Sequence, residues 1–378
     1  MRIGMIIRRL NVKGGTQRQM LSLARELKRR GHEIKIYTFA LDRERCYPEL
    51  LEGFEIKAAA TTPKGLALLM DKDFDILNPH DPGAEQTAYY YKKLVKRIPA
   101  VWNMNDTYSY RWNYDKARGV DEDFKKPFWR VMAYALFDRY MARRFLRHMD
   151  AIVVVDDFNR ELTKKYLGLP SVTVRNGPDL EHFTYQERKP IRGAKLLTSG
   201  ILLPHRRFED SIEAVKLLRD EGHEVTLSIA GDTENDKKYF AKLTALVEKL
   251  GVGKYVKFLG RISERELLDA YRGHDIYIFQ HHLQSDGLSP FEAAASGLPI
   301  IVSRTAGSHE VLTDGQNALF IDPKNPRDIA DKVRRLMQEP EFYVRLSREG
   351  NDFVRKNFSW QKYTDGVLKV FNEAKRQF

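Results

Sequence analysis

Short hydrophobic runs alternate along the chain with segments in which apolar residues recur at helical spacing. The first predicted strand is Arg2–Ile7, a helix follows near Thr16–Arg30, and the second predicted strand is Glu33–Thr38. Buried runs separated by amphipathic helices are typical of βαβ units, whose strands form a parallel sheet. Further strands are predicted at residues 75–77, 100–104, 151–155 and 172–174. The first half of the chain therefore predicts a Rossmann-like domain.

A second series of the same kind follows a charged segment, residues 187–193, that contains Pro190 and Gly193. Proline and glycine interrupt helices and strands, so this segment is predicted to link two domains. Later strands are predicted at residues 195–199, 225–230, 255–259, 276–279, 299–302 and 318–320. We expect two doubly wound α/β domains, over residues 1–187 and 188–355. An amphipathic C-terminal helix within residues 356–378 is free to pack back on the first domain.

Length and topology together predict where a ligand binds. A chain of 378 residues exceeds the size at which one hydrophobic core keeps growing. In open parallel sheets ligands bind beyond the carboxyl ends of the strands, which for two facing sheets is the space between the domains. The site is therefore expected to draw residues from both halves of the chain.

Composition excludes several other classes of protein. The hydrophobic share of 42% and charged share of 31% are ordinary for globular proteins, which excludes disordered and collagen-like chains. Cys46 is the only cysteine, so neither an intrachain disulfide nor a four-thiolate zinc site is possible. The N-terminus lacks a signal-peptide pattern, and no apolar run is long enough to span a membrane. These features predict a cytoplasmic protein, soluble or peripheral at the inner membrane face.

The positive charge is concentrated in the first part of the chain. Residues 1–150 contain 29 Lys and Arg against 19 Asp and Glu, within a net charge of +12 for the whole chain. Such asymmetry suits an anionic acceptor or an anionic lipid surface, and also serves plain solubility. A nucleic-acid partner is not expected, because no reading motif is present. Residues 111–148 are dense in aromatic and basic side chains, which form either a helical core or a surface for the acceptor or the membrane.

Two glycine-containing segments are candidates for phosphate binding. Gly14-Gly15-Thr16 precedes the first helix, where unpaired backbone N–H groups favour an anion. The alternative is a tight turn with Thr16 as N-cap. The richer segment runs from Gln284 to Glu292, with Gly287 allowing a close approach of backbone to ligand. Its alternative is a capping box, since Ser289 and Glu292 have the required spacing.

Other polar residues are candidates for the site, each with an alternative explanation. His80, in Asn78-Pro79-His80-Asp81, either lines the ligand site or packs as a loop histidine at the end of a strand. Asp73-Phe74-Asp75 superficially matches a metal-binding D-x-D motif, but it stands at the entry to a strand. His281 and His282 would point apart in extended backbone. No metal site is predicted.

The segment GLSPFEAAASGLPIIVS, followed by GSHEVL, resembles the E-x7-E region of family-4 retaining glycosyltransferases. Several other stretches resemble the same family. They are Met1–Thr38 with its Gly-Gly loop and G-H turn, Arg175-Asn176-Gly177-Pro178-Asp179 with Phe183, Gly200–Arg207, Phe258-Leu259-Gly260, Asp314-Gly315 and Ser359-Trp360. Together they cover nearly the whole chain. The resemblance implies the GT-B fold and transfer of a sugar, with retention of configuration, from a UDP- or GDP-sugar to a glycan, lipid-linked or small-molecule acceptor.

The resemblance also implies roles for individual residues. Glu292 would bind the ribose hydroxyls, because a carboxylate accepts two hydrogen bonds at once. Arg206, which replaces the family lysine, would bind the diphosphate together with Arg207. The backbone N–H groups of the segment Gly287, Leu288 and Ser289 would contact the distal phosphate and sugar, and Gly15 would close the other side. No cofactor and no divalent cation are expected besides the nucleotide-sugar donor.

Three positions depart from the family pattern. Gln284 replaces the first glutamate of E-x7-E, and Ile201 replaces an arginine that would contact phosphate. The family's catalytic histidine aligns with Asn105, which precedes Asp106. We take His80, Asn105, Asp106 and Gln284 as catalytic candidates. The departures leave two alternatives: a nucleotide-sugar-binding protein without turnover, and another GT-B enzyme such as a nucleotide-sugar epimerase.

Overall fold

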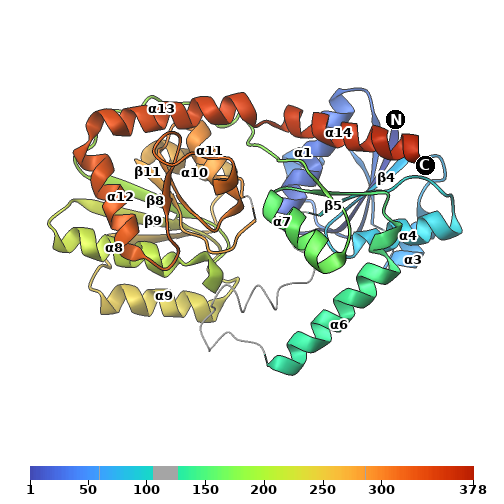
Figure 1. Cartoon of the computed structure of the whole chain (residues 1–378), viewed down its shortest axis with the longest axis horizontal. Coiled ribbons are helices and arrows are strands. Elements are labelled where there is room, and N and C mark those ends of the chain that lie inside the picture. The colour runs from blue at the N-terminus through green and yellow to red at the C-terminus, as the bar shows by residue number, and fades with distance from the viewer. Residues whose placement is uncertain (59, 105–126, 286) are drawn as a thin grey trace. The chain divides into compact units, whose positions relative to one another are not determined.

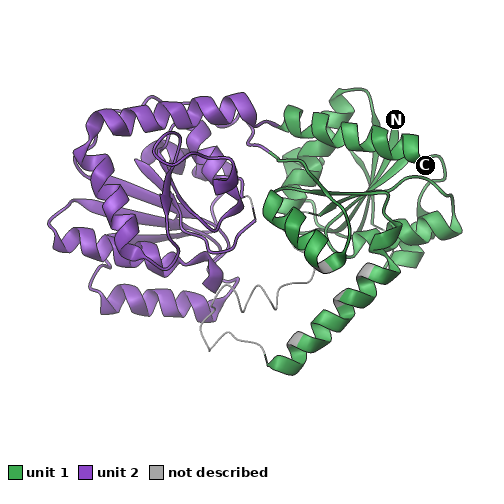
Figure 2. Ribbon diagram, viewed as in Figure 1, with its two compact units in different colours: residues 1–112, 126–176, 360–378 green, residues 113–125, 177–359 purple. Residues whose placement is uncertain are grey.

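The computed structural model describes residues 1–378 except 59, 105–126 and 286 (Figure 1). The chain divides into two compact units (Figure 2). Of the described residues, the first unit contains those up to Met104, residues 127–176 and the C-terminal segment Trp360–Phe378, and the second contains those from Gly177 to Ser359. The division lies between Asn176 and Gly177, whereas the pattern of the sequence placed it after residue 187.

The first unit is built on a parallel sheet of seven strands in the order β3-β2-β1-β4-β5-β6-β7. This order, which grows outward in both directions from β1, is that of a doubly wound Rossmann fold. Each strand predicted in this half is present, and β3 was missed because Ile56 is its only apolar residue. The strands are β1 (Arg2–Leu10), β2 (Glu33–Leu41), β3 (Glu55–Lys57), β4 (Ile76–His80), β5 (Val101–Met104), β6 (Ala151–Val154) and β7 (Val172–Thr173).

Amphipathic helices bury their apolar faces on this sheet. In α1 (Gly15–Arg29), for example, Met20, Leu23 and Leu27 are fully buried, while the last turn carries the basic residues Lys28 and Arg29, which suits the negative end of the helix dipole. The other helices of the unit are α2 (Pro48–Leu51), α3 (Pro63–Leu69), α4 (Ala84–Leu94), α6 (Phe128–Arg144), α7 (Asp157–Leu162) and α14 (Trp360–Gln377), with shorter helical turns at Leu146–His148 and Thr163–Leu167.

The C-terminal helix α14 is part of the first unit and packs against α1 (Figure 1). The Tyr363 hydroxyl, which is buried, accepts a hydrogen bond from Asn103 Nδ2 at 2.8 Å. Gly366 faces the Val174 side chain so closely that a Cβ there would lie 2.5 Å from Cγ1. The C-terminal helix is therefore an integral part of the first unit.

The second unit has a parallel sheet of six strands in the order β10-β9-β8-β11-β12-β13. All six strands were predicted. They are β8 (Ala194–Ser199), β9 (Val225–Ala230), β10 (Val256–Gly260), β11 (Ile276–Phe279), β12 (Ile300–Ser303) and β13 (Leu319–Ile321). The helices are α8 (Phe208–Asp220), α9 (Lys237–Lys249), α10 (Glu264–Gly273), α11 (Ser289–Ala295), α12 (Pro326–Gln338) and α13 (Pro340–Asn357), with short turns at Pro204–Arg206 and Gly307–Glu310.

The charged segment predicted to link the domains belongs to the second unit. Arg188 is only 8% exposed, and its guanidinium donates to the carbonyl oxygens of Tyr271, at 2.8 Å, and His274, at 2.7 Å. These carbonyls lie at and just beyond the C-terminal end of α10, where carbonyl groups lack partners within the helix. Arg188, whose charge suggested solvent exposure, therefore provides hydrogen-bond donors to the carbonyl groups at the end of α10.

Candidate active site

The candidate residues of the second unit gather where β8 and β11 end. These strands are neighbours in the parallel sheet, so the loops after them leave the same edge. The Arg206 guanidinium donates from Nη1 to His281 Nδ1 at 2.9 Å, and Gln280 Nε2 donates to the Arg206 carbonyl at 3.1 Å. The amide of His282 donates to the His205 carbonyl at 2.9 Å. The loop carrying Arg206 is thus tied to the extension of β11.

Arg207 differs from Arg206 in its surroundings. Its backbone is left-handed, with φ +53°, and its guanidinium donates to Asp210 at 2.6 Å. Glu209 lies 2.9 Å from the same guanidinium. A diphosphate would therefore compete with two carboxylates for Arg207.

Glycine is required at position 287 for two reasons. Its φ is +78°, a left-handed conformation in which a side chain is strained. A Cβ at this position would also lie 2.7 Å from Phe279 Cζ. Gly287 therefore brings the start of α11 closer to the end of β11 than any other residue would allow.

The capping box suggested by the sequence is not formed. Helix α11 begins at Ser289, its N-cap is Leu288, and no side chain caps it. Glu292 lies instead in the first turn, where it is 3% exposed and accepts a hydrogen bond from the Tyr271 hydroxyl at 3.2 Å. Burial and the nearby charge of Glu292 hold the pKa of Tyr271 well above its usual value. The buried carboxylate is therefore not explained by helix capping.

Gln284 adjoins this group of residues. Its side-chain Nε2 donates to Ser285 Oγ at 3.3 Å, and its carbonyl accepts from the Gly307 amide at 2.8 Å. Ile201, which stands where the resemblance expects an arginine, is 45% exposed. The loop therefore presents an apolar side chain at that position.

In the first unit, Gly15 is the first residue of α1 and is exposed. The N-cap is Gly14, which makes no side-chain bond, so the expectation of Thr16 as the N-cap is wrong. The alternative based on capping therefore does not account for this glycine pair.

His80 is fully buried at the end of β4 in a chain of hydrogen bonds. Its Nε2 lies 2.7 Å from Asn78 Oδ1, and Asn78 Nδ2 donates to Asn103 Oδ1 at 2.9 Å. Asn103 in turn donates to Tyr363. Burial lowers the pKa of His80 to about 3, so the ring is neutral. Of the two alternatives for His80, this burial favours packing at the strand end over direct contact with a ligand.

Two carboxyl groups close to His80, the half-buried Asp81 and the fully buried Glu85, were not among the predicted site residues. Burial raises the pKa of Asp81 to about 8 and that of Glu85 to about 7. The Arg8 amide donates to Asp81, at 3.2 Å, and the Gly83 amide donates to Glu85 Oε2 at 2.6 Å. Asp81 has a left-handed backbone, with φ +62°. Gly83, between the two residues, was the only sequence signal for an unusual loop, because the burial of a side chain cannot be judged from a loop sequence.

The remaining candidate residues either lie outside the described part of the chain or are engaged in other contacts. Asn105 and Asp106 lie outside the described residues. In the D-x-D stretch, Asp75 accepts from the Arg2 amide at 2.8 Å and Asp73 pairs with the Arg2 guanidinium, so both are engaged. Within the described ranges no group of three or more His, Cys, Asp or Glu is arranged to hold a metal ion. No helix of the described chain is long and apolar enough to cross a membrane.

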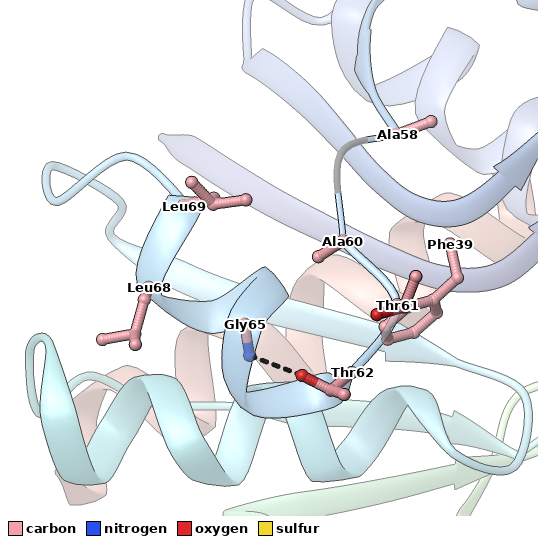
Figure 3. Close-up of a pocket in the computed structure, with 8 residues that line it drawn as sticks. All are labelled: Phe39, Ala58, Ala60, Thr61, Thr62, Gly65, Leu68 and Leu69. Atoms are coloured by element: carbon pink, nitrogen blue, oxygen red, sulfur yellow. Dashed lines mark hydrogen bonds between the residues drawn. The ribbon is translucent and has the colours of Figure 1, made fainter.

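The first unit also has a groove of about 700 Å³ beside α3 (Figure 3). Thr62, the N-cap of α3, accepts from the Gly65 amide at 3.1 Å at its rim. The groove is lined by Phe39, Ala58, Ala60, Thr61, Thr62, Gly65, Leu68 and Leu69. None of these side chains is ionisable and none is a predicted site residue, so the groove brings no acid, base or cation to a reaction.

Comparisons with known proteins assign both halves of the chain. Residues 13–182 match the family described as Glycosyltransferase Family 4, and residues 183–353 match Glycosyl transferases group 1. Both halves of the chain therefore match glycosyltransferase families. The resemblance inferred from the sequence is thereby confirmed at the level of the family, while the roles assigned to its E-x7-E region stay predictions.

Relatives agree with this assignment. Glycogen synthase of Mycobacterium tuberculosis is 30% identical over 61% of this chain and 56% of its own length. D-inositol 3-phosphate glycosyltransferase of Saccharomonospora viridis is 28% identical over 61% of this chain and 57% of its own. The chain thus spans about half the length of these curated relatives.

A solved structure shows the fold. The Anabaena HepE protein, in complex with UDP-glucose, has a TM-score of 0.80 at 15% identity and covers 99% of this chain and 100% of its own. At that identity the likeness establishes the fold alone. The predicted GT-B class, with two Rossmann-like domains, is confirmed.

Proposed function

We propose that this chain is a retaining glycosyltransferase that moves a sugar from a UDP- or GDP-sugar to a glycan, lipid-linked or small-molecule acceptor. The observation that carries the proposal is that Arg206 and Glu292 follow the neighbouring parallel strands β8 and β11 of the second unit, at the same edge of the sheet. Arg206 is held on the loop after β8, and Glu292 is buried at the start of α11, which follows β11. A cation and a carboxylate are the groups that bind a diphosphate and a ribose, respectively.

In this proposal the second unit holds the donor. Arg206 and the backbone N–H groups of Gly287, Leu288 and Ser289 stabilise the diphosphate as it departs, because it is where negative charge develops. Glu292 accepts hydrogen bonds from the ribose hydroxyls. The phosphate contact is assigned to Arg206 rather than Arg207, whose guanidinium already meets Glu209 and Asp210. The reaction then requires no divalent cation.

The first unit holds the acceptor, with Gly15 at the start of α1 and the catalytic candidates Asn105 and Asp106, whereas fully buried His80 is a positioning residue at the end of β4. In this arrangement neutral His80 acts through its hydrogen bond to Asn78 rather than as a proton donor, because its pKa is far below neutrality. Gln284, an amide, contacts the donor sugar as donor and acceptor at once. That difference from a carboxylate is expected to influence which sugar is accepted.

Peripheral attachment to an anionic membrane, at a cytoplasmic location, is part of the proposal. Helix α6 supports it, because a stripe of apolar side chains at helical spacing is exposed: Trp129 is 66% exposed, Leu136 64% and Tyr140 57%. Arg139 and Arg143 are exposed along one side of this stripe. Aromatic and basic side chains together suit the headgroup region of an anionic bilayer. These exposed side chains of α6 therefore do not form a helical core, which was the alternative for residues 111–148.

Product analysis tests the reaction. The chain is screened by thermal shift against UDP- and GDP-sugars, and a donor that stabilises it is incubated with glycan and lipid-linked acceptors, with and without EDTA. A glycosylated product whose anomeric configuration matches the donor, formed equally in EDTA, supports the proposal. Donor binding without product supports the binding-protein alternative, and an isomerised donor supports the epimerase.

Vesicle sedimentation tests the attachment separately. Charge reversal of Arg139 and Arg143 is expected to reduce binding to anionic vesicles and leave donor affinity unchanged. Binding should also fade with rising salt, since the Debye length is about 10 Å at 0.1 M. Charge reversal at Arg45, which is exposed on the loop after β2, serves as control. Equal effects of the two changes would contradict the role of α6.

A further inference from the structure

His281 is a fully buried residue of the second unit that the proposed function has not used. It lies two residues after the end of β11, and its ring lies against two aromatic rings: the centroid distance is 4.1 Å to Phe279 and 5.7 Å to Phe208. Its Nδ1 lies 2.9 Å from Arg206 Nη1. A guanidinium can only donate, so Nδ1 is the acceptor and the neutral ring carries its proton on Nε2.

The rest of the described chain gives this ring no second polar contact. His281 Nε2 is buried and has no hydrogen-bond partner. Burial, with the charges of Arg206 and His205, lowers the pKa of His281 well below its usual value, so the ring stays neutral. A buried N–H without a partner costs about 1–3 kcal/mol. An apolar side chain would fill the same place without that cost, so stability does not account for a histidine here.

What the ring does make is one hydrogen bond, and it goes to the residue assigned to the diphosphate. The backbone of Arg206 is held as well, because Gln280 Nε2 donates to its carbonyl at 3.1 Å. An arginine side chain that is already held loses less conformational freedom when it binds a phosphate. This smaller entropy loss matters here because Ile201 stands where the resemblance expects a second phosphate-binding cation.

We propose that His281 is a positioning residue that aims the Arg206 guanidinium at the donor diphosphate. The inference rests on the proposed function, since it takes Arg206 as the phosphate contact. Its chemistry is specific: the position requires an acceptor that faces Arg206, carried on a flat side chain that fits between Phe279 and Phe208.

Two substitutions separate these requirements. His281→Phe keeps a ring but removes the acceptor, and His281→Asn keeps an acceptor oxygen close to the position of Nδ1. Isothermal titration with UDP and GDP, and with uridine and guanosine, measures the diphosphate increment. We expect His281→Phe to weaken the better-bound nucleotide about tenfold, equivalent to ordering one long side chain, and to leave its nucleoside unchanged. His281→Asn should restore most of the loss.

A double-mutant cycle decides whether His281 acts through Arg206. In an Arg206→Ala background, His281→Phe should cause no further loss of nucleotide affinity. The matched control is His274→Phe, because His274 is a half-buried histidine of the same unit that bonds Ser228 and the Ala270 carbonyl. It should lower the melting temperature without changing the diphosphate increment.

Two results would overturn the proposal. One is a loss from His281→Phe that is as large without Arg206 as with it, and the other is an equal loss for nucleotide and nucleoside. Failure of the proposed function looks different: a wild-type chain that binds neither UDP nor GDP would refute that function, and this role of His281 with it.

Discussion

Replacing Glu292 by alanine separates a ligand contact from a structural one. The carboxylate is 3% exposed and accepts from the Tyr271 hydroxyl at 3.2 Å. Removing it deprives Tyr271 of this partner, although the hydroxyl retains a contact of 3.4 Å with the Ser289 carbonyl. A hydrogen bond to a charged group contributes about 1.5–3 kcal/mol, so the free energy of unfolding should fall by about that amount.

The effect on binding should be larger. If two ribose hydroxyls donate to Glu292, at about 1.5 kcal/mol each, their loss amounts to about 3 kcal/mol, or about 100-fold in Kd. Titration calorimetry with UDP and GDP measures this, and urea unfolding measures stability. Tyr271→Phe is the matched control, because it removes the same internal bond and keeps the carboxylate. If Glu292→Ala lowered stability but bound nucleotide as tightly as Tyr271→Phe does, Glu292 would be a structural residue and the ribose assignment would be wrong.

Three further outcomes are expected. Arg206→Ala should weaken UDP or GDP far more than uridine or guanosine in titration calorimetry, and an equal loss would mean that Arg206 acts through folding. Gly287→Ala should lower the free energy of unfolding by about 2–4 kcal/mol in urea, because its Cβ meets Phe279 Cζ at 2.7 Å in a left-handed backbone; Ile201→Ala, at an exposed side chain, should change little. Burial raises the pKa of Glu85 to about 7, from 4.5, so its contribution to stability is complete below pH 4.5 and about 3 kcal/mol is lost as the pH rises through 7. Glu85→Gln should flatten that decline in urea titrations from pH 4.5 to 8, and an unchanged pH profile would refute the assignment.

The sequence alone determined the class of fold, because the period of apolar residues distinguishes buried parallel strands from amphipathic helices. It therefore predicted twelve of the thirteen strands of the described chain, and missed β3, in which Ile56 is the only apolar residue. The segment from Gln284 to Glu292 was also found from sequence, because glycine, proline and a lone carboxylate stand out against apolar neighbours.

Tertiary structure decided the rest, because burial and partnership depend on residues far apart in the chain. Arg206 and Arg207 are neighbours with the same chemistry, yet one meets His281 and the other meets Asp210. The charged stretch around Arg188 is indistinguishable from a linker until α10 supplies the carbonyls that it binds. Likewise, the pKa of Glu85 is raised because packing excludes water from its carboxyl group, and a local pattern of residues does not show that exclusion.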